Sequence, residues 1–385
     1  MQAIPTLISR REVIVAAPTG SGKTASYTIP LLHNLKKPSK SGIRAVIVLP
    51  TNELSSQVHN EFLKLSSGKP FKICLLQKTD IKLTHFDILI STPKRLIHVI
   101  QNGLNLSSVE SLILDECDTL LSEGFLPQID EIVSACANTN LLVSLFSATI
   151  SPGVEDLAKS FMKDPVRIVI GEKNTVVEEV DQKLIYTMNE EGKLVALRRK
   201  IREGVKPPVL IFVQSKVRAE ELFREFVYEN LNVDIITGDR TTAQRERTTQ
   251  QFREGKIWFL IATNLMARGM DFKGVHLVIN FDLPTNPTDY IHRVGRTGRM
   301  GKRGTAETYY TDDDIPYLRQ IVNLIKASGK EVPAWLLNIR KLPKRDMKRL
   351  SKLPVQRDHV LHDPKLLAQN ESEHSQKEKN KPKHK

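Results

Sequence analysis

Three clusters of residues have the types and spacing that phosphate chemistry needs, and the first is the loop APTGSGKT. Its glycines let successive backbone N–H groups face a phosphate at the start of a helix. Lys23 would neutralise charge on the β- and γ-phosphates, and the Thr24 hydroxyl would ligate Mg²⁺. Ala17 replaces the first glycine of the phosphate-loop pattern, so the loop fits that pattern only in part. For a glycine-rich turn taken alone, a plain structural turn is the alternative. The predicted nucleotide-binding residues here are Ala17, Pro18, Thr19, Gly20, Ser21, Gly22, Lys23 and Thr24.

The second cluster is SLILDECD, where Asp115 and Glu116 follow an apolar run that suits a strand. Asp115 at the carboxyl end of a strand would hold Mg²⁺ through water. Glu116 would orient or deprotonate a water that attacks a phosphoanhydride. The alternative is an acidic helix start that the helix dipole favours. Together with Lys23, the pair predicts a nucleoside triphosphatase.

The third cluster, YIHRVGRTGR, places His292, Arg296 and Arg299 in one dense cationic turn. A surface basic patch is one interpretation. The other is an arginine finger that reaches the γ-phosphate, an effect of about 10³–10⁵ in rate where it is known. Because this turn lies far along the chain, the second interpretation makes hydrolysis depend on the closure of two domains.

Short apolar runs alternate with amphipathic stretches over most of the chain, and they must position these clusters. In the first half EVIVAAP, IRAVIVLP and FDILIST are continuously apolar, which indicates strands buried on both faces of a parallel sheet. Helices are predicted between such strands, for example over 52–65 and 94–101. The pattern restarts at KLIYTM, with helices predicted over 192–202, from 216 and over 313–328. The sequence therefore predicts two doubly wound α/β domains with a ligand cleft between them.

Predicted boundaries follow from composition. The first α/β domain covers 1–172, a polar linker 173–182, the second domain 183–335, and a basic, disordered tail 336–385. Residues 341–385 hold 13 Lys or Arg against 6 Asp or Glu, so they supply +7 of the net charge of +13. A solvated tail is the simpler interpretation of this segment, and an extra RNA-holding arm is the sharper one.

Composition narrows the function classes. A net charge of +13 and a pI near 9.5 favour a polyanionic partner such as nucleic acid. Three cysteines without metal or disulfide spacing indicate a reducing compartment. The longest apolar runs are too short to span a membrane, and the N-terminus has no signal-peptide pattern. We therefore expect a soluble intracellular protein with no membrane partner.

These elements, in this order, resemble the DEAD-box RNA helicases of superfamily 2 over about residues 1–340. Further motifs carry the resemblance: STPKR, SAT, FVQS, GDRTTAQRER and ATNLMARGMD. The resemblance implies two RecA-like parallel-sheet domains in tandem and an RNA-dependent ATPase that uses ATP and Mg²⁺. Within the family, the stretch around GKIWFLIATNLMARGMD resembles the subgroup assigned to small-subunit ribosomal RNA maturation. That placement implies the nucleus and nucleolus, a ribosome-assembly protein as cofactor, and a monomer.

The resemblance also implies roles for single residues. Asp271, with Gly269 beside it, would hold the ATP ribose, Arg296 and Arg299 the γ-phosphate, and His292 would help to couple the domains. Coupling between ATP and RNA is implied for Ser147, Ala148 and Thr149. RNA backbone contacts are implied for Pro50, Thr51, Thr92, Pro93, Arg95, Ser215, Gly238, Thr263 and Arg268. Such contacts go to phosphate and 2′-OH groups, so they select RNA without reading sequence.

The implied mechanism is linkage. ATP and RNA both favour the closed arrangement, so each strengthens binding of the other. Closure bends one strand over the helix 94–101 and breaks a short duplex locally, and phosphate loss reopens the cleft.

The sequence departs from the family pattern at several points. Asn52 stands where an arginine is usual, and Asn264 stands where an aspartate is usual. CLLQKTD replaces the expected glycine pair, so we assign no RNA contact there. The glutamine motif that reads adenine would precede MQAIP and is absent from this sequence. A truncated gene model or isoform is our preferred explanation over a trimmed chain or a true divergence, and weaker preference for ATP over GTP is the expected consequence.

Two other functions stay open at this stage. A non-catalytic RNA-binding assembly factor with impaired nucleotide use would bind RNA without nucleotide dependence. A DNA translocase is disfavoured by the motif set, and equal stimulation by DNA and RNA would revive it.

Overall fold

The computed structural model describes the chain except for residues 1, 19, 40–41, 78–85, 123, 151, 171–178, 265–271, 273, 299–302, 340–342, 344–354, 358 and 361–385. The chain forms two compact units. The first holds 1–179 with 268–271 and 290–302, and the second holds 180–267, 272–289 and 303–385. The segment that contains HRVGRTGR is therefore grouped with the N-terminal sheet.

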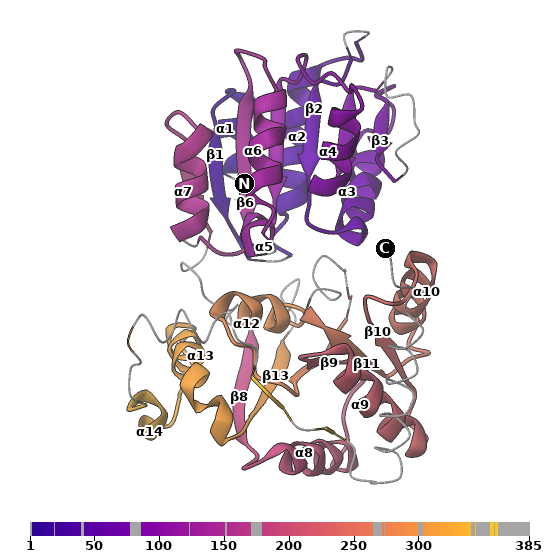
Figure 1. Cartoon of the computed structure of the whole chain (residues 1–385), viewed down its shortest axis with the longest axis vertical. Coiled ribbons are helices and arrows are strands. Elements are labelled where there is room, and N and C mark those ends of the chain that lie inside the picture. The colour runs from indigo at the N-terminus through magenta and orange to yellow at the C-terminus, as the bar shows by residue number, and fades with distance from the viewer. Residues whose placement is uncertain are drawn as a thin grey trace, which may run out of the picture. The chain divides into compact units, whose positions relative to one another are not determined.

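A fully parallel sheet of seven strands forms the centre of the first unit, in the order β3-β4-β2-β5-β6-β1-β7 (Figure 1). The strands β1, β2 and β4 are buried along their whole length, as their continuous apolar runs predicted. Their bounds are β1 Val13–Ala16, β2 Ala45–Val48, β3 Ile73–Leu75, β4 Ile88–Ser91, β5 Ser111–Asp115, β6 Leu142–Ser147 and β7 Val166–Val169.

Helices cover both faces of this sheet, because successive strand residues point to opposite sides. In β1, Val13 and Val15 pack into the core that holds Tyr27 and Phe62, whereas Ile14 packs into the other core. The first core is closed by α1 Ala3–Ile8, α2 Lys23–Leu35 and α3 Asn52–Leu65. The other is closed by α4 Pro93–Gln101, α5 Cys117–Ser122, α6 Leu126–Ala135 and α7 Pro152–Phe161.

The second unit is built on a parallel sheet of six strands in the order β10-β11-β9-β12-β13-β8. Its strands are β8 Val180–Tyr186, β9 Val209–Val213, β10 Val233–Ile236, β11 Phe259–Thr263, β12 Leu277–Asn280 and β13 Gly304–Tyr310. The helical elements that follow these strands along the chain are α8 Glu190–Arg202, α9 Lys216–Tyr228, α10 Thr242–Arg253, α12 Pro287–Val294, the 3₁₀ turn η1 Asp312–Asp314, α13 Ile315–Ala327 and α14 Ala334–Leu337. From Tyr290 onward, α12 belongs to the first unit.

The predicted fold class of two parallel α/β domains is confirmed. Capping side chains define the starts of two helices. The helix α3 spans the predicted 52–65 because the Thr51 side chain accepts a hydrogen bond from Leu54 N and caps its start. The helix α8 begins two residues before the predicted 192, because Asn189 caps it by accepting from Gly192 N. The exact domain boundaries and the cleft stay predictions.

No helix among the described residues is long and apolar enough to cross a membrane. Part of the predicted tail is described. Val355, Gln356, Arg357, His359 and Val360 belong to the second unit, and Val360 is buried in its core. These residues are therefore an ordered part of the second unit, which differs from the disorder predicted over 336–385.

Candidate nucleotide and RNA site

The phosphate loop lies between β1 and α2, at the carboxyl edge of the first sheet, where parallel α/β sheets bind ligands. Gly20 and Gly22 have φ of 83° and 90°, left-handed backbone that favours glycine. Ala17 N donates to Ser147 O at 3.0 Å, so the loop is anchored to the end of β6. Lys23 is buried, and its Nζ donates to Ala17 O at 2.8 Å. The Lys23 ammonium thus lies inside the loop, as phosphate binding requires. Thr19, another residue of the loop, lies outside the described residues.

Asp115 and Glu116 follow at the same edge, at the end of β5, and both are buried. Asp115 Oδ2 accepts a hydrogen bond from the Tyr27 hydroxyl at 3.0 Å, and Glu116 Oε1 lies 4.0 Å from Lys23 Nζ. Burial, and then the neighbouring Glu116 carboxylate, raise the pKa of Asp115 to about 6 against the opposing pull of Lys23. Glu116 has a φ of 53°, in a region that non-glycine residues rarely adopt.

This part of the site fits a divalent cation. Asp115 is a buried carboxylate whose charge is poorly compensated, and among the described residues Glu116 Oε2 is a buried oxygen without a hydrogen-bond partner. The Tyr27 hydroxyl interacts with both Asp115 and Thr24, which brings the two predicted magnesium ligands to one place. Hard carboxylate and hydroxyl oxygens are the ligands that Mg²⁺ prefers. Mg²⁺ held there would neutralise charge on the phosphates of a bound nucleotide.

Ser147 and Asp118 join the loop to the predicted coupling motif Ser147–Thr149. Ser147 Oγ accepts from Asp118 N at 3.3 Å, while its carbonyl holds Ala17 N. Asp118 Oδ2 accepts from Thr149 Oγ1 at 2.6 Å and from Thr149 N at 3.1 Å. The SAT motif is therefore hydrogen-bonded to the phosphate loop through the Ser147 carbonyl, and to the acidic motif through the side chains of Ser147 and Thr149.

His292 lies beside the same carboxylate within the first unit, with Nε2 3.2 Å from Asp118 Oδ2. Burial alone would raise the pKa of Asp118, but the imidazole of His292 and the Thr149 hydrogen bond outweigh it and hold that pKa well below its usual range. Ligand atoms of Glu116, Asp118 and His292 lie within 4.8 Å of one another. Asp118 already accepts two hydrogen bonds from Thr149. Thr24 and Asp115 are therefore better placed than Asp118 to hold Mg²⁺.

Arg296 is buried, and its Nε donates to His292 O at 3.1 Å. The structure thus gives its guanidinium a place in the first unit, and its role at the γ-phosphate stays a prediction. The other residues predicted to contact nucleotide, Arg299, Gly269 and Asp271, lie outside the described residues.

The predicted RNA residues of the first unit gather at the carboxyl ends of β2 and β4, which are neighbours in the sheet. Pro50 and Thr51 follow β2, and Thr92 precedes α4, whose first residues include Pro93 and Arg95. Leu49 N donates to Ser91 O at 3.0 Å, which holds the two strand ends together. Arg95 Nη1 donates to Leu76 O at 3.3 Å, and Leu76 is part of the CLLQKTD segment that lacks the glycine pair.

In the second unit Ser215, Gly238 and Thr263 lie at the carboxyl ends of β9, β10 and β11, which are adjacent in the sheet. Ser215 caps α9 by accepting from Arg218 N at 3.3 Å. A Cβ at Gly238 would lie 3.4 Å from Lys216 Cε, which is an ordinary van der Waals contact, so space alone does not require glycine here. Asn264 Nδ2 donates to Asp289 Oδ2 at 2.8 Å, a bond that the usual aspartate could not make when ionised. Arg268 lies outside the described residues.

Sequence reasoning missed Asp118 and Tyr27 as site residues. Asp118 is the last residue of the quoted DECD motif, so its proximity to Asp115 was a usable signal. Tyr27 is fully buried on α2 and edge-on to Phe146, so its apolar surroundings resemble those of an ordinary core tyrosine. Its hydroxyl partner is 88 residues away, and sequence spacing gives no sign of that bond.

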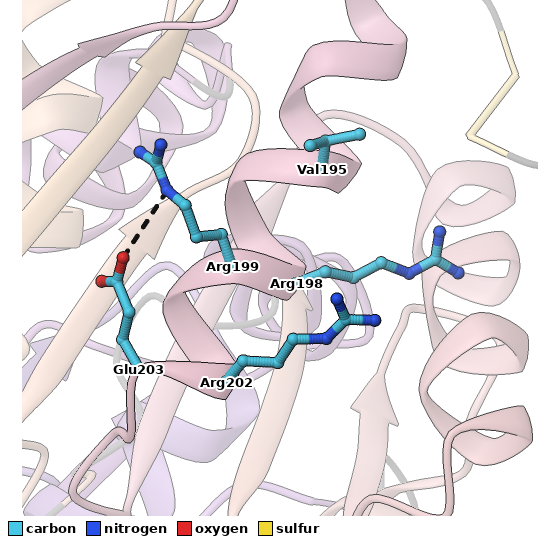
Figure 2. Close-up of a pocket in the computed structure, with 5 residues that line it drawn as sticks. All are labelled: Val195, Arg198, Arg199, Arg202 and Glu203. Atoms are coloured by element: carbon cyan, nitrogen blue, oxygen red, sulfur yellow. Dashed lines mark ion pairs between the residues drawn. The ribbon is translucent and has the colours of Figure 1, made fainter.

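A separate hollow of about 400 Å³ lies on the surface of α8, near its C-terminal end (Figure 2). Val195, Arg198, Arg199, Arg202 and Glu203 line it. Arg199 pairs with Glu203, and Arg198 pairs with Glu225 and Glu229. None of the residues predicted to bind nucleotide or RNA lines this hollow.

Comparison with known proteins identifies the family of this chain. The family model described as DEAD/DEAH box helicase matches residues 1–157, and the model described as helicase conserved C-terminal domain matches residues 192–301. The chain belongs to the DEAD-box ATP-dependent RNA helicase family.

Particular relatives are similar over most of the chain. A probable ATP-dependent RNA helicase ddx52 of Dictyostelium discoideum is 52% identical over 348 residues, which cover 88% of this chain and 52% of that protein. DEAD-box ATP-dependent RNA helicase 57 of Arabidopsis thaliana is 48% identical, with coverage of 94% and 67%. ATP-dependent RNA helicase ROK1 of Scheffersomyces stipitis is 43% identical, with coverage of 95% and 69%. The chain thus spans between about half and two thirds of the length of these relatives.

Solved structures agree with the fold. Dbp5 of S. cerevisiae bound to RNA and ADP BeF₃ superposes with a TM-score of 0.76 at 26% identity, covering 91% of this chain and 90% of that one. Mss116p bound to ssRNA and AMP-PNP gives a TM-score of 0.76 at 26% identity, with coverage of 96% and 79%. Both neighbours were solved with RNA and a nucleotide or its analogue.

Proposed function

We propose that this chain is an RNA-dependent ATPase that locally unwinds or remodels short RNA duplexes. The observation that carries the proposal is the bonded chain from the phosphate loop through Ser147 to Asp118 and Thr149. Ser147 and Asp118 therefore connect the nucleotide loop, the acidic motif and the coupling motif by hydrogen bonds. Such a junction is suited to report the nucleotide state to the RNA edge of the sheet.

Each residue has a defined task in this proposal. The glycine loop and Lys23 bind the β- and γ-phosphates, and Thr24 and Asp115 hold Mg²⁺. Glu116 orients the attacking water and accepts its proton at a carboxylate oxygen. The RNA backbone lies along the strand ends that carry Thr51, Thr92 and Ser215. Binding of ATP and RNA is linked through closure of the two domains, with Arg296 and Arg299 completing the phosphate site.

We also propose pre-ribosomal RNA of the small subunit as the substrate, in the nucleolus, with a ribosome-assembly protein as cofactor and the chain acting as a monomer. Support comes from the subgroup resemblance of the second-domain motifs and from the similarity to relatives named DDX52 and ROK1. Cross-linking of the tagged chain to RNA in cells should recover small-subunit precursor RNA above messenger RNA. Equal recovery of both classes would contradict this assignment.

The test of the enzymatic proposal is steady-state ATP hydrolysis by the full chain with and without RNA or DNA of matched length. RNA should stimulate turnover, DNA should stimulate it less, and Glu116→Gln should lower the stimulated rate by about 10²–10⁴-fold because a general base is lost. Glu220→Gln makes the same chemical change at an exposed position of α9 and should leave the rate unchanged. A rate that RNA does not alter would sink the proposal and favour a non-catalytic RNA-binding factor, which no observation favours at present.

A further inference from the structure

The carboxyl edge of the second sheet carries a buried cluster of charges that the proposed function does not use. Glu190 follows β8, Asp282 follows β12 and Asp314 follows β13, and the side chains of Asp282 and Asp314 are fully buried. Lys193 Nζ lies 2.7 Å from Glu190, 3.3 Å from Asp282 and 3.9 Å from Asp314. Arg218 pairs with Asp282 and Glu190 at 2.7 and 2.6 Å. These five residues comprise three acids and two bases, so they leave one negative charge uncompensated.

Arg357, from the segment predicted to be a disordered tail, supplies the missing charge. Its side chain is 2% exposed, and its nitrogens lie 2.6 Å from Asp314, 3.1 Å from Glu190 and 3.6 Å from Asp282. Burial would raise the pKa of Asp282, but attraction by Arg218, Lys193 and Arg357 outweighs it and holds that pKa well below its usual range. A buried cluster of this kind is stable only when its charges are paired.

Three described residues near Arg357 are also held by the second unit, namely Val355, His359 and Val360, and we call these four residues the latch. Gln214 Nε2 donates to Val355 O at 2.8 Å. Val360 N donates to Glu221 Oε2 at 2.9 Å, and the Val360 side chain is buried in the core. His359 Nδ1 contacts the other oxygen of Glu221.

The latch binds Gln214, the residue next to a predicted RNA contact. Arg357 Nε donates to Gln214 Oε1 at 2.7 Å, so both ends of the Gln214 amide are bound by the latch. Gln214 immediately precedes Ser215, the predicted RNA contact at the end of β9. In the sheet, β9 separates the strands that carry Gly238 and Thr263 from the strands that carry the charge cluster. The latch and the predicted RNA residues therefore meet at the end of β9.

We propose that this latch is an internal device of the second unit in which Arg357 positions Gln214 and Ser215 for RNA. This inference rests on the proposed RNA binding. Arg357 acts through Gln214 and is a positioning residue.

The experiment compares full chains that carry Arg357→Met, Arg357→Lys or the control Arg202→Met, which removes the same charge from an exposed position of α8 in the same unit. The RNA concentration for half-maximal ATPase stimulation should rise about five- to tenfold in Arg357→Met, with the rate at saturating RNA within about twofold of the parent. Arg357→Lys should recover part of the affinity because it restores charge but not the fork of donors. Arg202→Met should match the parent.

A second variant separates positioning from folding. Arg357→Met with Asp314→Asn removes one base and one acid, so the buried cluster stays neutral, and the amide oxygen can still accept from Thr311 N as Asp314 does. We expect thermal stability to recover in this variant while RNA affinity stays weakened. Recovery of RNA affinity together with stability, or a parent-like affinity in Arg357→Met, would overturn the latch. A parent chain that RNA does not stimulate would instead contradict the proposed function.

Discussion

At the scale of single residues, Asp115 shows how much electrostatic strain the nucleotide site contains. Its carboxylate is buried beside Glu116, and the Tyr27 hydroxyl and Lys23 compensate only part of its charge. Its pKa is therefore raised to about 6, against about 3.9 in an unfolded chain. Folding takes up a proton between these two values, so the charged carboxylate costs the folded state stability above about pH 6.

Asp115→Asn should remove that cost. At about pH 7.5, without nucleotide or Mg²⁺, the variant should be more stable than the parent by about 1–3 kcal/mol, because one unit of pKa corresponds to about 1.4 kcal/mol. The difference should shrink as pH falls from about 6 to about 4, where the parent carboxyl is already protonated. Urea unfolding at several pH values measures it.

Asp118→Asn provides the matched comparison of opposite sign. The pKa of Asp118 is held below its usual range, so its ionised form stabilises the folded chain above about pH 4 and that contribution is lost as pH falls through the lowered pKa. The substitution should therefore destabilise the chain at about pH 7.5. Equal effects of the two substitutions would contradict the electrostatic account of the site.

Single residues also mark where sequence reasoning stops. Lys23, Asp115 and Glu116 were predictable because each sits in a short motif at a strand end. The bond from Tyr27 to Asp115 was not, because it joins residues 88 positions apart. Arg357 was assigned to a solvated tail because a basic run with no periodicity has no local signal for a buried partner.

At the scale of elements, the start of α2 depends on a backbone conformation that only glycine adopts without strain. Gly22 caps the helix at φ 90° and ψ 22°, and this turn aims the first N–H groups of α2 at the phosphate position. A Cβ at Gly22 would meet nothing within 4 Å, so the restriction is on the backbone and not on space.

Gly22→Ala should therefore lower the free energy of unfolding by about 1–2 kcal/mol, the cost of left-handed backbone for a residue with a Cβ. Nucleotide affinity should also fall, because a relaxed turn misplaces the N–H donors. Gly255→Ala is the matched control, since Gly255 has φ 75°, follows α10 and also has nothing within 4 Å of its Cβ position. Calorimetric unfolding and ADP titration should show similar stability losses and an affinity loss in Gly22→Ala alone. An affinity loss in both variants would tie nucleotide binding to general stability instead.

Most elements were predictable because continuous apolar runs identify strands with two buried faces. The prediction of strand β8 was the least accurate, because it placed the start of the strand at Lys183 and the strand begins at Val180. It lies at the edge of its sheet beside β13 and alternates buried with exposed residues in its first half, so its apolar signal is weaker. The pairing of sheet neighbours, such as β2 with β4, depends on the three-dimensional topology and not on any one run.

At the scale of the whole molecule, each sheet gathers its functional residues at the carboxyl ends of its strands. In the first unit this edge joins the phosphate loop to the predicted RNA residues, and in the second it joins the predicted RNA residues to the latch. Family membership and this distribution lead to one central claim, that nucleotide and RNA bind as linked ligands.

The measurement that tests this claim most directly is the affinity of the full chain for a short single-stranded RNA, determined with a non-hydrolysable ATP analogue and with ADP. Linkage predicts that the analogue tightens RNA binding by about 5- to 150-fold relative to ADP, a coupling of about 1–3 kcal/mol. The same tightening should disappear in Lys23→Ala, which cannot hold the phosphates. An RNA dissociation constant that is the same with the analogue, with ADP and without nucleotide would contradict the account.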